Sequence, residues 1–137
     1  MLRRWRTASV EETRDLGASL VAELLPDRLL LLEGDLGAGK TVLAQGLAAG
    51  LGIPPEEIQS PTYTIVREHR GPRGRLVHVD LYRLEPRDAE AIGLEELLAG
   101  EGVKVVEWPQ RLPFPVGPAL RLRLRRLGES ERAVEEL

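Results

Sequence analysis

The stretch that decides the fold runs from residue 34 to residue 41 and reads Gly34-Asp35-Leu36-Gly37-Ala38-Gly39-Lys40-Thr41. It directly follows an apolar run, 29–32, made only of leucine, and a helix-like segment, 42–51, comes next. The spacing G-x-x-x-x-G-K-T between a buried strand and a helix is typical of a loop that cradles nucleotide phosphates. The sequence therefore predicts a nucleotide site at this turn.

The residue types in the loop account for that chemistry. Glycines let successive backbone N–H groups point inward at the start of a helix, where a phosphate is stabilised. Lys40 is expected to reach the β- and γ-phosphates of ATP, and the Thr41 hydroxyl to ligate Mg²⁺. The residues predicted to contact the nucleotide in this loop are Asp35, Leu36, Gly37, Ala38, Gly39, Lys40, Thr41 and Val42.

Composition narrows the class of protein. The chain has 137 residues, which predicts one domain over 1–137. It has no cysteine, and its two histidines are not spaced as a metal pair, so a metal should be held by oxygen, as Mg²⁺ is. No apolar stretch is long enough to span a bilayer, and we expect a cytoplasmic protein. A net charge of −3 argues against a dedicated nucleic-acid binder, although it leaves room for local basic patches.

Hydrophobic periodicity divides the chain into alternating elements. Strands are predicted at 2–7, 28–33, 62–69, 75–80, 103–107 and 119–127. Helices are predicted at 10–25, 42–51 and 86–99, the last broken at Gly93 and closed by Gly100. The turn 70–74 makes its two flanking strands an antiparallel hairpin. The segment 128–137 is short and polar, which predicts a frayed tail.

Two acidic residues stand where a phosphate loop needs a partner. Asp80 and Glu107 each end an apolar strand, and open α/β sheets bind ligands beyond the carboxyl ends of their strands. One carboxylate would hold the metal or its water, and the other would position the attacking water. The spacing does not assign these two roles between them, and either residue could instead cap the next segment.

Three other features have both a functional and an ordinary interpretation. The hydroxyl-rich segment Ser60-Pro61-Thr62-Tyr63-Thr64 is either a switch that senses the γ-phosphate or a simple turn into a strand. Trp108 either stacks near a ligand or covers the core. The alternating arginines of 119–127 either meet RNA phosphates or form an ordinary solvated strand face, the default interpretation.

Four signatures in this order resemble the TsaE family, formerly YjeE. They are the loop 34–41, Ser-Pro-Thr-Tyr-Thr at 60–64, His-Val-Asp-Leu-Tyr-Arg-Leu at 78–84 and Glu-Trp-Pro at 107–109. The resemblance also includes residues in the first helix and 92–96, so it covers nearly the whole chain. It implies a reduced P-loop NTPase-type fold, a three-layer α/β sandwich. This agrees with the hairpin predicted above, which makes the expected small, mainly parallel central sheet mixed.

The resemblance also implies an activity and partners. Members of that family are small ATPases needed for the N6-threonylcarbamoyladenosine modification at position 37 of tRNA. This chain would bind ATP and Mg²⁺, dock on a complex of the proteins TsaD and TsaB, and reset that complex by hydrolysis, meeting tRNA only through the complex. Lys40 and Thr41 would be the phosphate and metal residues, Asp80 and Glu107 the acidic pair, Thr62 the switch threonine and Trp108 the adjacent tryptophan.

Two alternatives belong to other classes of protein. A small-molecule P-loop kinase would need an acceptor pocket and a lid over the phosphates, and the chain has no insertion of lid length. A nucleotide-gated interaction module would need ATP binding to order 60–64 but would not need hydrolysis. An ATP analogue that cannot be cleaved separates the module from the ATPase.

Overall fold

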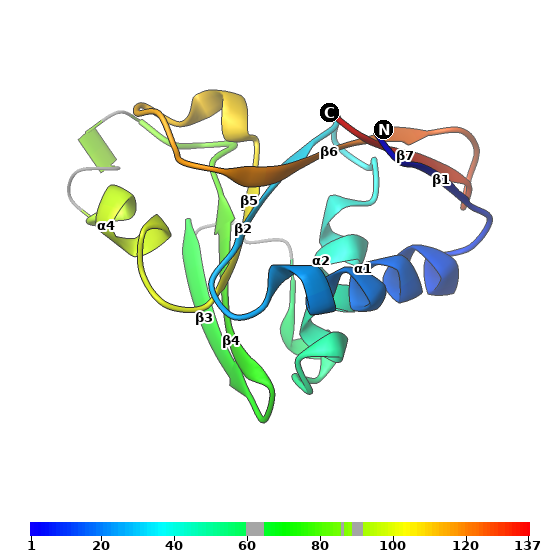
Figure 1. The fold of residues 1–137 in the computed structure, drawn as a ribbon. Helices are drawn as coiled ribbons and strands as arrows, with labels where there is room; N and C mark the ends of the chain where they lie inside the picture. The colour runs from blue at the N-terminus through cyan, green and yellow to red at the C-terminus, as the bar shows by residue number, and fades with distance from the viewer. Residues whose placement is uncertain (60–64, 86, 89–91) are drawn as a thin grey trace.

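The protein is a seven-stranded sheet with helices on both faces. The computed structural model describes residues 1–59, 65–85, 87–88 and 92–137 (Figure 1). The strands are β1 (Arg4–Thr7), β2 (Leu29–Glu33), β3 (Val66–Gly71), β4 (Gly74–Asp80), β5 (Val103–Glu107), β6 (Ala119–Arg126) and β7 (Arg132–Glu136). The helices are α1 (Val10–Leu24), α2 (Lys40–Gly50) and α4 (Leu94–Leu98), with 3-10 turns η1 (Pro55–Glu57) and η2 (Pro109–Arg111).

The middle of the sheet is parallel and its two edges are antiparallel. The strand order is β1-β7-β6-β2-β5-β4-β3. Strands β6, β2, β5 and β4 pair in parallel, while β3 turns back on β4, and β7 runs antiparallel to both β6 and β1. The predicted hairpin and mixed sheet are confirmed. The carboxyl ends of four parallel strands therefore meet at one edge, next to the loop that follows β2.

Alternate residues of the central strands divide between two cores. Leu30 and Leu32 of β2 belong to the core beneath α1 and α2, whereas Leu29 and Leu31 belong to the core beneath α4. All four are at most 6% exposed, as the unbroken leucine run predicts for a strand buried on both faces. The result is the three-layer α/β sandwich expected from the sequence.

Helix α2, which begins in the phosphate-loop sequence, is held tightly against α1. Ser9 caps α1 by accepting a hydrogen bond from the Glu12 N–H, as a capping-box start predicts. Gly17 and Gly46 face each other where the helices cross, and a Cβ on either would collide with the backbone of the other helix. This close approach fixes α2, and hence the loop before it, against the sheet.

The end of the chain differs from its prediction. Residues 128–137 were expected to fray, but Arg132–Glu136 forms β7, which pairs with β1 on one side and β6 on the other. The prediction was wrong because the segment has only one buried side chain, Val134, and so shows little hydrophobic pattern. It is stabilised mainly by backbone pairing with strands that are distant in the sequence.

The remaining differences are at element ends. The strand predicted at 62–69 is described only as β3 from Val66 onward, and 60–64 lies outside the described residues. The predicted break at Gly93 is confirmed, because Gly93 is left-handed with φ 64° and caps α4.

Candidate functional site

The loop between β2 and α2 has the open backbone geometry of a phosphate cradle. Gly37 and Gly39 adopt left-handed conformations, with φ values of 81° and 102°, which side chains disfavour. A Cβ built on Gly37 meets no atom within 4 Å, so this side of the loop is open. Gly39 is the N-cap of α2 and no side chain caps the helix. The first N–H groups of α2 are thus left for an anion.

Lys40 lies at the centre of the candidate site. It is only 4% exposed, and its Nζ donates a 2.6 Å hydrogen bond to the Gly34 carbonyl across the loop. The same Nζ lies 3.8 Å from the centroid of the Trp108 ring, a cation–π distance. Burial lowers the pKa of Lys40, while the nearby carboxylates Glu107, Asp80 and Asp35 oppose that shift.

The two predicted acids lie side by side on the face of the sheet that carries α2. Asp80 of β4 and Glu107 of β5 are direct partners in the parallel register. Their neighbours Leu76 and Val105, which alternate onto the same face, pack in the core beneath α1 and α2. Three elements, β4, β5 and the start of α2, therefore bring Asp80, Glu107 and Lys40 together, as the sequence predicted.

Glu107 has a buried partner that the sequence analysis did not assign. His78 Nε2 and Glu107 Oε2 lie 2.6 Å apart, and both side chains are almost fully buried. With Glu107 as a carboxylate, which only accepts hydrogen bonds, the imidazole Nε2–H is the donor. His78 Nδ1 has no partner among the described residues. The signal in the sequence was the i, i+2 spacing of His78 and Asp80, which puts both on one face of β4.

Asp80 has a different environment from Glu107. Burial raises the pKa of Asp80, and the negative charge of Glu107 adds to that rise. The Tyr82 backbone N–H donates a 3.0 Å hydrogen bond to Asp80 Oδ1 and opposes the rise, as do the charges of His78 and Lys40. Of the two carboxylates, Asp80 is the more exposed.

Trp108 lies over the candidate site as well as against the core. It is the only residue other than glycine with a positive φ, 61°, among the described residues. Its ring packs on the Tyr82 ring, with centroids 5.0 Å apart, and also contacts the Lys40 ammonium. A strained backbone at such a position is common where a side chain is held for function.

Arg132 is a second residue at the site, after His78, that sequence reasoning missed. Its NH2 donates a 3.1 Å hydrogen bond to the Gly37 carbonyl, and its side chain lies against Gly39. Its NH1 donates to the carbonyls of Gly128, Glu129 and Glu131, which fix the position of the guanidinium. The contact joins residues 95 positions apart and depends on β7, so no local pattern could have revealed it.

The donors near the loop fit Mg²⁺ bound together with phosphates. Among the described residues no group of three His, Cys, Asp or Glu side chains could hold a metal alone. Mg²⁺ commonly uses one or two protein oxygens together with substrate phosphates and water. The half-buried Thr41, at the second position of α2, and one of the two carboxylates match that set. Thr62, the predicted switch threonine, lies outside the described residues.

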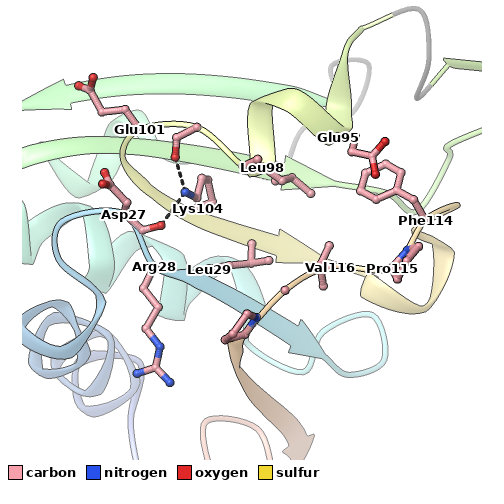
Figure 2. Close-up of a pocket in the computed structure, with 14 residues that line it drawn as sticks. Asp27, Arg28, Leu29, Glu95, Leu98, Glu101, Lys104, Phe114, Pro115 and Val116 are labelled. Carbon is pink, nitrogen blue, oxygen red and sulfur yellow. Dashed lines mark hydrogen bonds between the residues drawn. The ribbon is translucent and has the colours of Figure 1, made fainter.

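A second feature lies at the opposite ends of the parallel strands. A pocket of about 670 Å³ lies between the start of β2, α4, β5 and the segment before β6, and Figure 2 draws its lining residues. Lys104 is buried beside it, and its Nζ donates 2.6 Å hydrogen bonds to the Asp27 and Gly100 carbonyls. None of the predicted site residues lines this pocket.

These features define a class of protein: a three-layer α/β sandwich with a phosphate-loop motif between a central parallel strand and its helix, facing two carboxylates. The family model described as "Threonylcarbamoyl adenosine biosynthesis protein TsaE" matches residues 7–134. The chain belongs to the TsaE family.

Individual relatives agree with the family match. The chain is 41% identical over 133 residues to the tRNA threonylcarbamoyladenosine biosynthesis protein TsaE of Bacillus subtilis (strain 168), covering 96% of this chain and 82% of that protein. It is 39% identical over 129 residues to the protein of the same name in Treponema pallidum, covering 92% and 93%. The crystal structure of Bacillus subtilis YdiB matches with a TM-score of 0.71 and 34% identity, over 99% of this chain and 84% of that one. No helix among the described residues is long and apolar enough to cross a membrane.

Proposed function

We propose that this protein binds ATP with Mg²⁺ at the loop 34–41 and hydrolyses it in support of tRNA N6-threonylcarbamoyladenosine synthesis. The observation that carries the proposal is the position of Lys40, buried at the loop and surrounded by Asp80, Glu107 and Trp108. A desolvated lysine amid carboxylates, beside the uncapped start of a helix, suits the phosphates of a nucleotide. The tRNA-modification part of the proposal is supported by the membership of this chain in the TsaE family.

Lys40 and Trp108 would both rearrange on binding. In the structure, the Lys40 ammonium contacts one carbonyl and one aromatic ring. A phosphate oxygen is a stronger, charge-assisted acceptor than the Gly34 carbonyl, so Lys40 would turn from the loop toward the β- and γ-phosphates. Trp108 would then lose its cation and report binding by a change in fluorescence.

The two carboxylates would divide the work. The 2.6 Å contact with His78 fixes the orientation of the Glu107 carboxyl group, which suits a group that would hold the metal together with Thr41. Bound Mg²⁺ would neutralise part of the phosphate charge. Asp80, with its raised pKa and greater exposure, would position the water whose oxygen attacks the γ-phosphorus while the bridging bond to ADP breaks.

Arg132 would act as a positioning residue for this site. Its hydrogen bond to the Gly37 carbonyl holds the loop at a different residue from Lys40, which bonds to the Gly34 carbonyl. A loop fixed in its binding conformation loses less entropy when a nucleotide binds. The guanidinium also adds positive charge close to the cradle.

The decisive experiment measures ATP hydrolysis by the purified protein alone and after addition of TsaD and TsaB, the partners that we propose for it. We expect slow hydrolysis alone and strong stimulation by the partner proteins, with Lys40→Ala inactive in both conditions. Stimulation that persists in Lys40→Ala would place the active nucleotide site elsewhere. No stimulation, with ATP still bound, would remove hydrolysis from the proposed role.

A second measurement tests whether hydrolysis is needed for repeated turnover. An ATP analogue that cannot be cleaved should support one round of tRNA modification and block later rounds. Repeated rounds with the analogue would leave nucleotide binding, without hydrolysis, as the function of the loop.

A further inference from the structure

One half of the sheet is covered by helices on a single side only. In Figure 1, α1 and α2 lie on one side of β1, β7 and β6, and no helix of the described residues covers the other side. Leu120, Leu122 and Leu124 of β6 point into the core beneath those helices. Because side chains alternate along a strand, the residues between these leucines point to the uncovered side.

The uncovered side is rich in arginine. Its residues are Arg121, Arg123 and Arg125 of β6, together with Arg4 and Arg6 of β1, which flank the inward-facing Trp5. All five arginines are exposed. We refer to this set as the basic face.

Strand β7 brings the two ends of the chain together to form the basic face. Arg4 pairs with Glu135, which in turn pairs with Arg123 of β6. Two residues further along each strand, on the same face, Ala133 lies between Arg6 and Arg125. Because β7 lies between them, β1 and β6 are two strand spacings apart, so their arginines are separated by about 10 Å. The small Ala133 lies between them.

Carboxylates neutralise the basic face only in part. Arg6 pairs with Glu131 at 2.8 Å, and Arg123 lies at the limit of an ion pair, 3.9–4.0 Å, from Glu135 and Glu33. Within the described chain, Arg4, Arg121 and Arg125 have no ion pair. An excess of positive charge on one face is notable in a protein whose net charge is −3.

We propose that the basic face binds the phosphate backbone of RNA, with tRNA as the class of ligand. Arginine is suited to phosphate because its planar guanidinium donates two parallel hydrogen bonds and is weakly hydrated. An open sheet face with rows of arginine presents these groups to an extended polyanion. The chemistry of an RNA ligand follows from the proposed tRNA role of the family and does not depend on ATP hydrolysis.

The basic face also borders the candidate nucleotide site. Glu33, the last residue of β2, pairs in register with Arg123, and the phosphate loop begins at the next residue, Gly34. RNA bound across β6 would therefore lie beside the loop. This position gives the nucleotide a short route by which to influence RNA binding.

The test measures binding of a fluorescently labelled, unmodified tRNA transcript by anisotropy over a salt series. The test variant Arg4→Gln/Arg121→Gln/Arg125→Gln removes the three arginines without ion pairs. The control Arg28→Gln/Arg70→Gln/Arg87→Gln makes the same change in net charge at three exposed arginines on other surfaces. We expect the test variant to weaken binding by roughly tenfold or more and to flatten the salt dependence, because each lost phosphate contact lowers the slope by about 0.7–0.9.

Two further comparisons keep the result interpretable. The lysine version, Arg4→Lys/Arg121→Lys/Arg125→Lys, should retain most of the binding because it keeps the charge, and thermal unfolding should show all three variants folded. Equal weakening by the test and control variants would overturn the proposal, as would the absence of tRNA binding by the unaltered protein. If the test variant instead bound tRNA normally and lost only its binding to the protein partners, the basic face would bind an acidic protein surface. The RNA proposal would then be wrong.

Discussion

The chain has two lysines, both buried at opposite ends of the parallel strands, and they have very different surroundings. Lys104, at the amino end of β5, donates to two backbone carbonyls that hold it in place. Lys40, at the carboxyl edge, has one carbonyl and an aromatic ring, and the nearest charges are three carboxylates. Burial lowers the pKa of both. We infer from this difference that Lys104, held by two backbone carbonyls, supports the fold, while Lys40 serves the proposed nucleotide site.

The sharpest way to break this comparison is Lys40→Ala. We expect ATP hydrolysis to fall about a thousandfold, which corresponds to about 4 kcal/mol of transition-state stabilisation, because the transferred phosphoryl group loses the side-chain cation that would act on it together with Mg²⁺. The free energy of unfolding should change little, since removal of a desolvated charge offsets the lost hydrogen bond to Gly34. Turnover assays and urea denaturation check both parts. A large loss of stability would mean that Lys40 is structural, like Lys104.

Lys104→Met is the reverse experiment. It keeps the apolar stem but leaves the Asp27 and Gly100 carbonyls without their donor, so we expect the protein to lose about 2–3 kcal/mol of stability. The affinity for ATP should not change below the unfolding temperature, because the site lies at the other edge of the sheet. Urea denaturation and calorimetric titration with ATP provide the two measurements. An unchanged denaturation midpoint would contradict the role given to Lys104.

Substitution of Asp80 and Glu107 tests the surroundings of Lys40, one of the two lysines compared. Asp80→Asn and Glu107→Gln should each reduce hydrolysis by about a hundredfold, the usual order for a group that positions water or a metal, while ATP still binds. The control is Glu101→Gln, an exposed glutamate just before the amino end of β5, which should hydrolyse ATP normally. If both acidic variants lost ATP binding as completely as Lys40→Ala, the proposed division of roles would be wrong.

The smallest effect is expected at Arg132. Arg132→Gln should raise the Kd for ATP about fivefold to tenfold, near 1 kcal/mol, because the loop loses its hydrogen bond at Gly37. Arg126→Gln is a matched control: Arg126 pairs with Arg132 in register and also donates to the Gly128 carbonyl. Isothermal titration should show normal affinity for the control, and Arg132→Lys should recover part of the loss. Equal effects of Arg126→Gln and Arg132→Gln would assign the change to the β6–β7 turn alone.

Most of the fold followed from local patterns. The leucines of β2, the apolar spacing of α1 and the turn between β3 and β4 each depend on residues close together in sequence, so periodicity and turn chemistry were sufficient. Asp80 and Glu107 were also found in this way, because a carboxylate at the end of an apolar strand has a defined place in a parallel sheet.

The errors concern residues whose neighbours are distant. Segment 128–137 has the composition of a tail, and only pairing with β1 and β6 makes it a strand. His78 looked like one more strand residue until β5 placed Glu107 beside it. For the arginines of β6 the sequence left RNA phosphates and an ordinary solvated face as alternatives, and only β7 places the arginines of β1 on the same face.

The sequence by itself determined the phosphate loop, the parallel strands around it and the pair of acids, because each is a pattern within a few residues that restricts the backbone directly. The tertiary structure alone decided what surrounds these groups: the carbonyls that satisfy Lys104, the contact from Arg132 to Gly37 and the assembly of the basic face. Those features depend on strand order and register, which arise from burial of the two cores as a whole and leave no local mark in the chain.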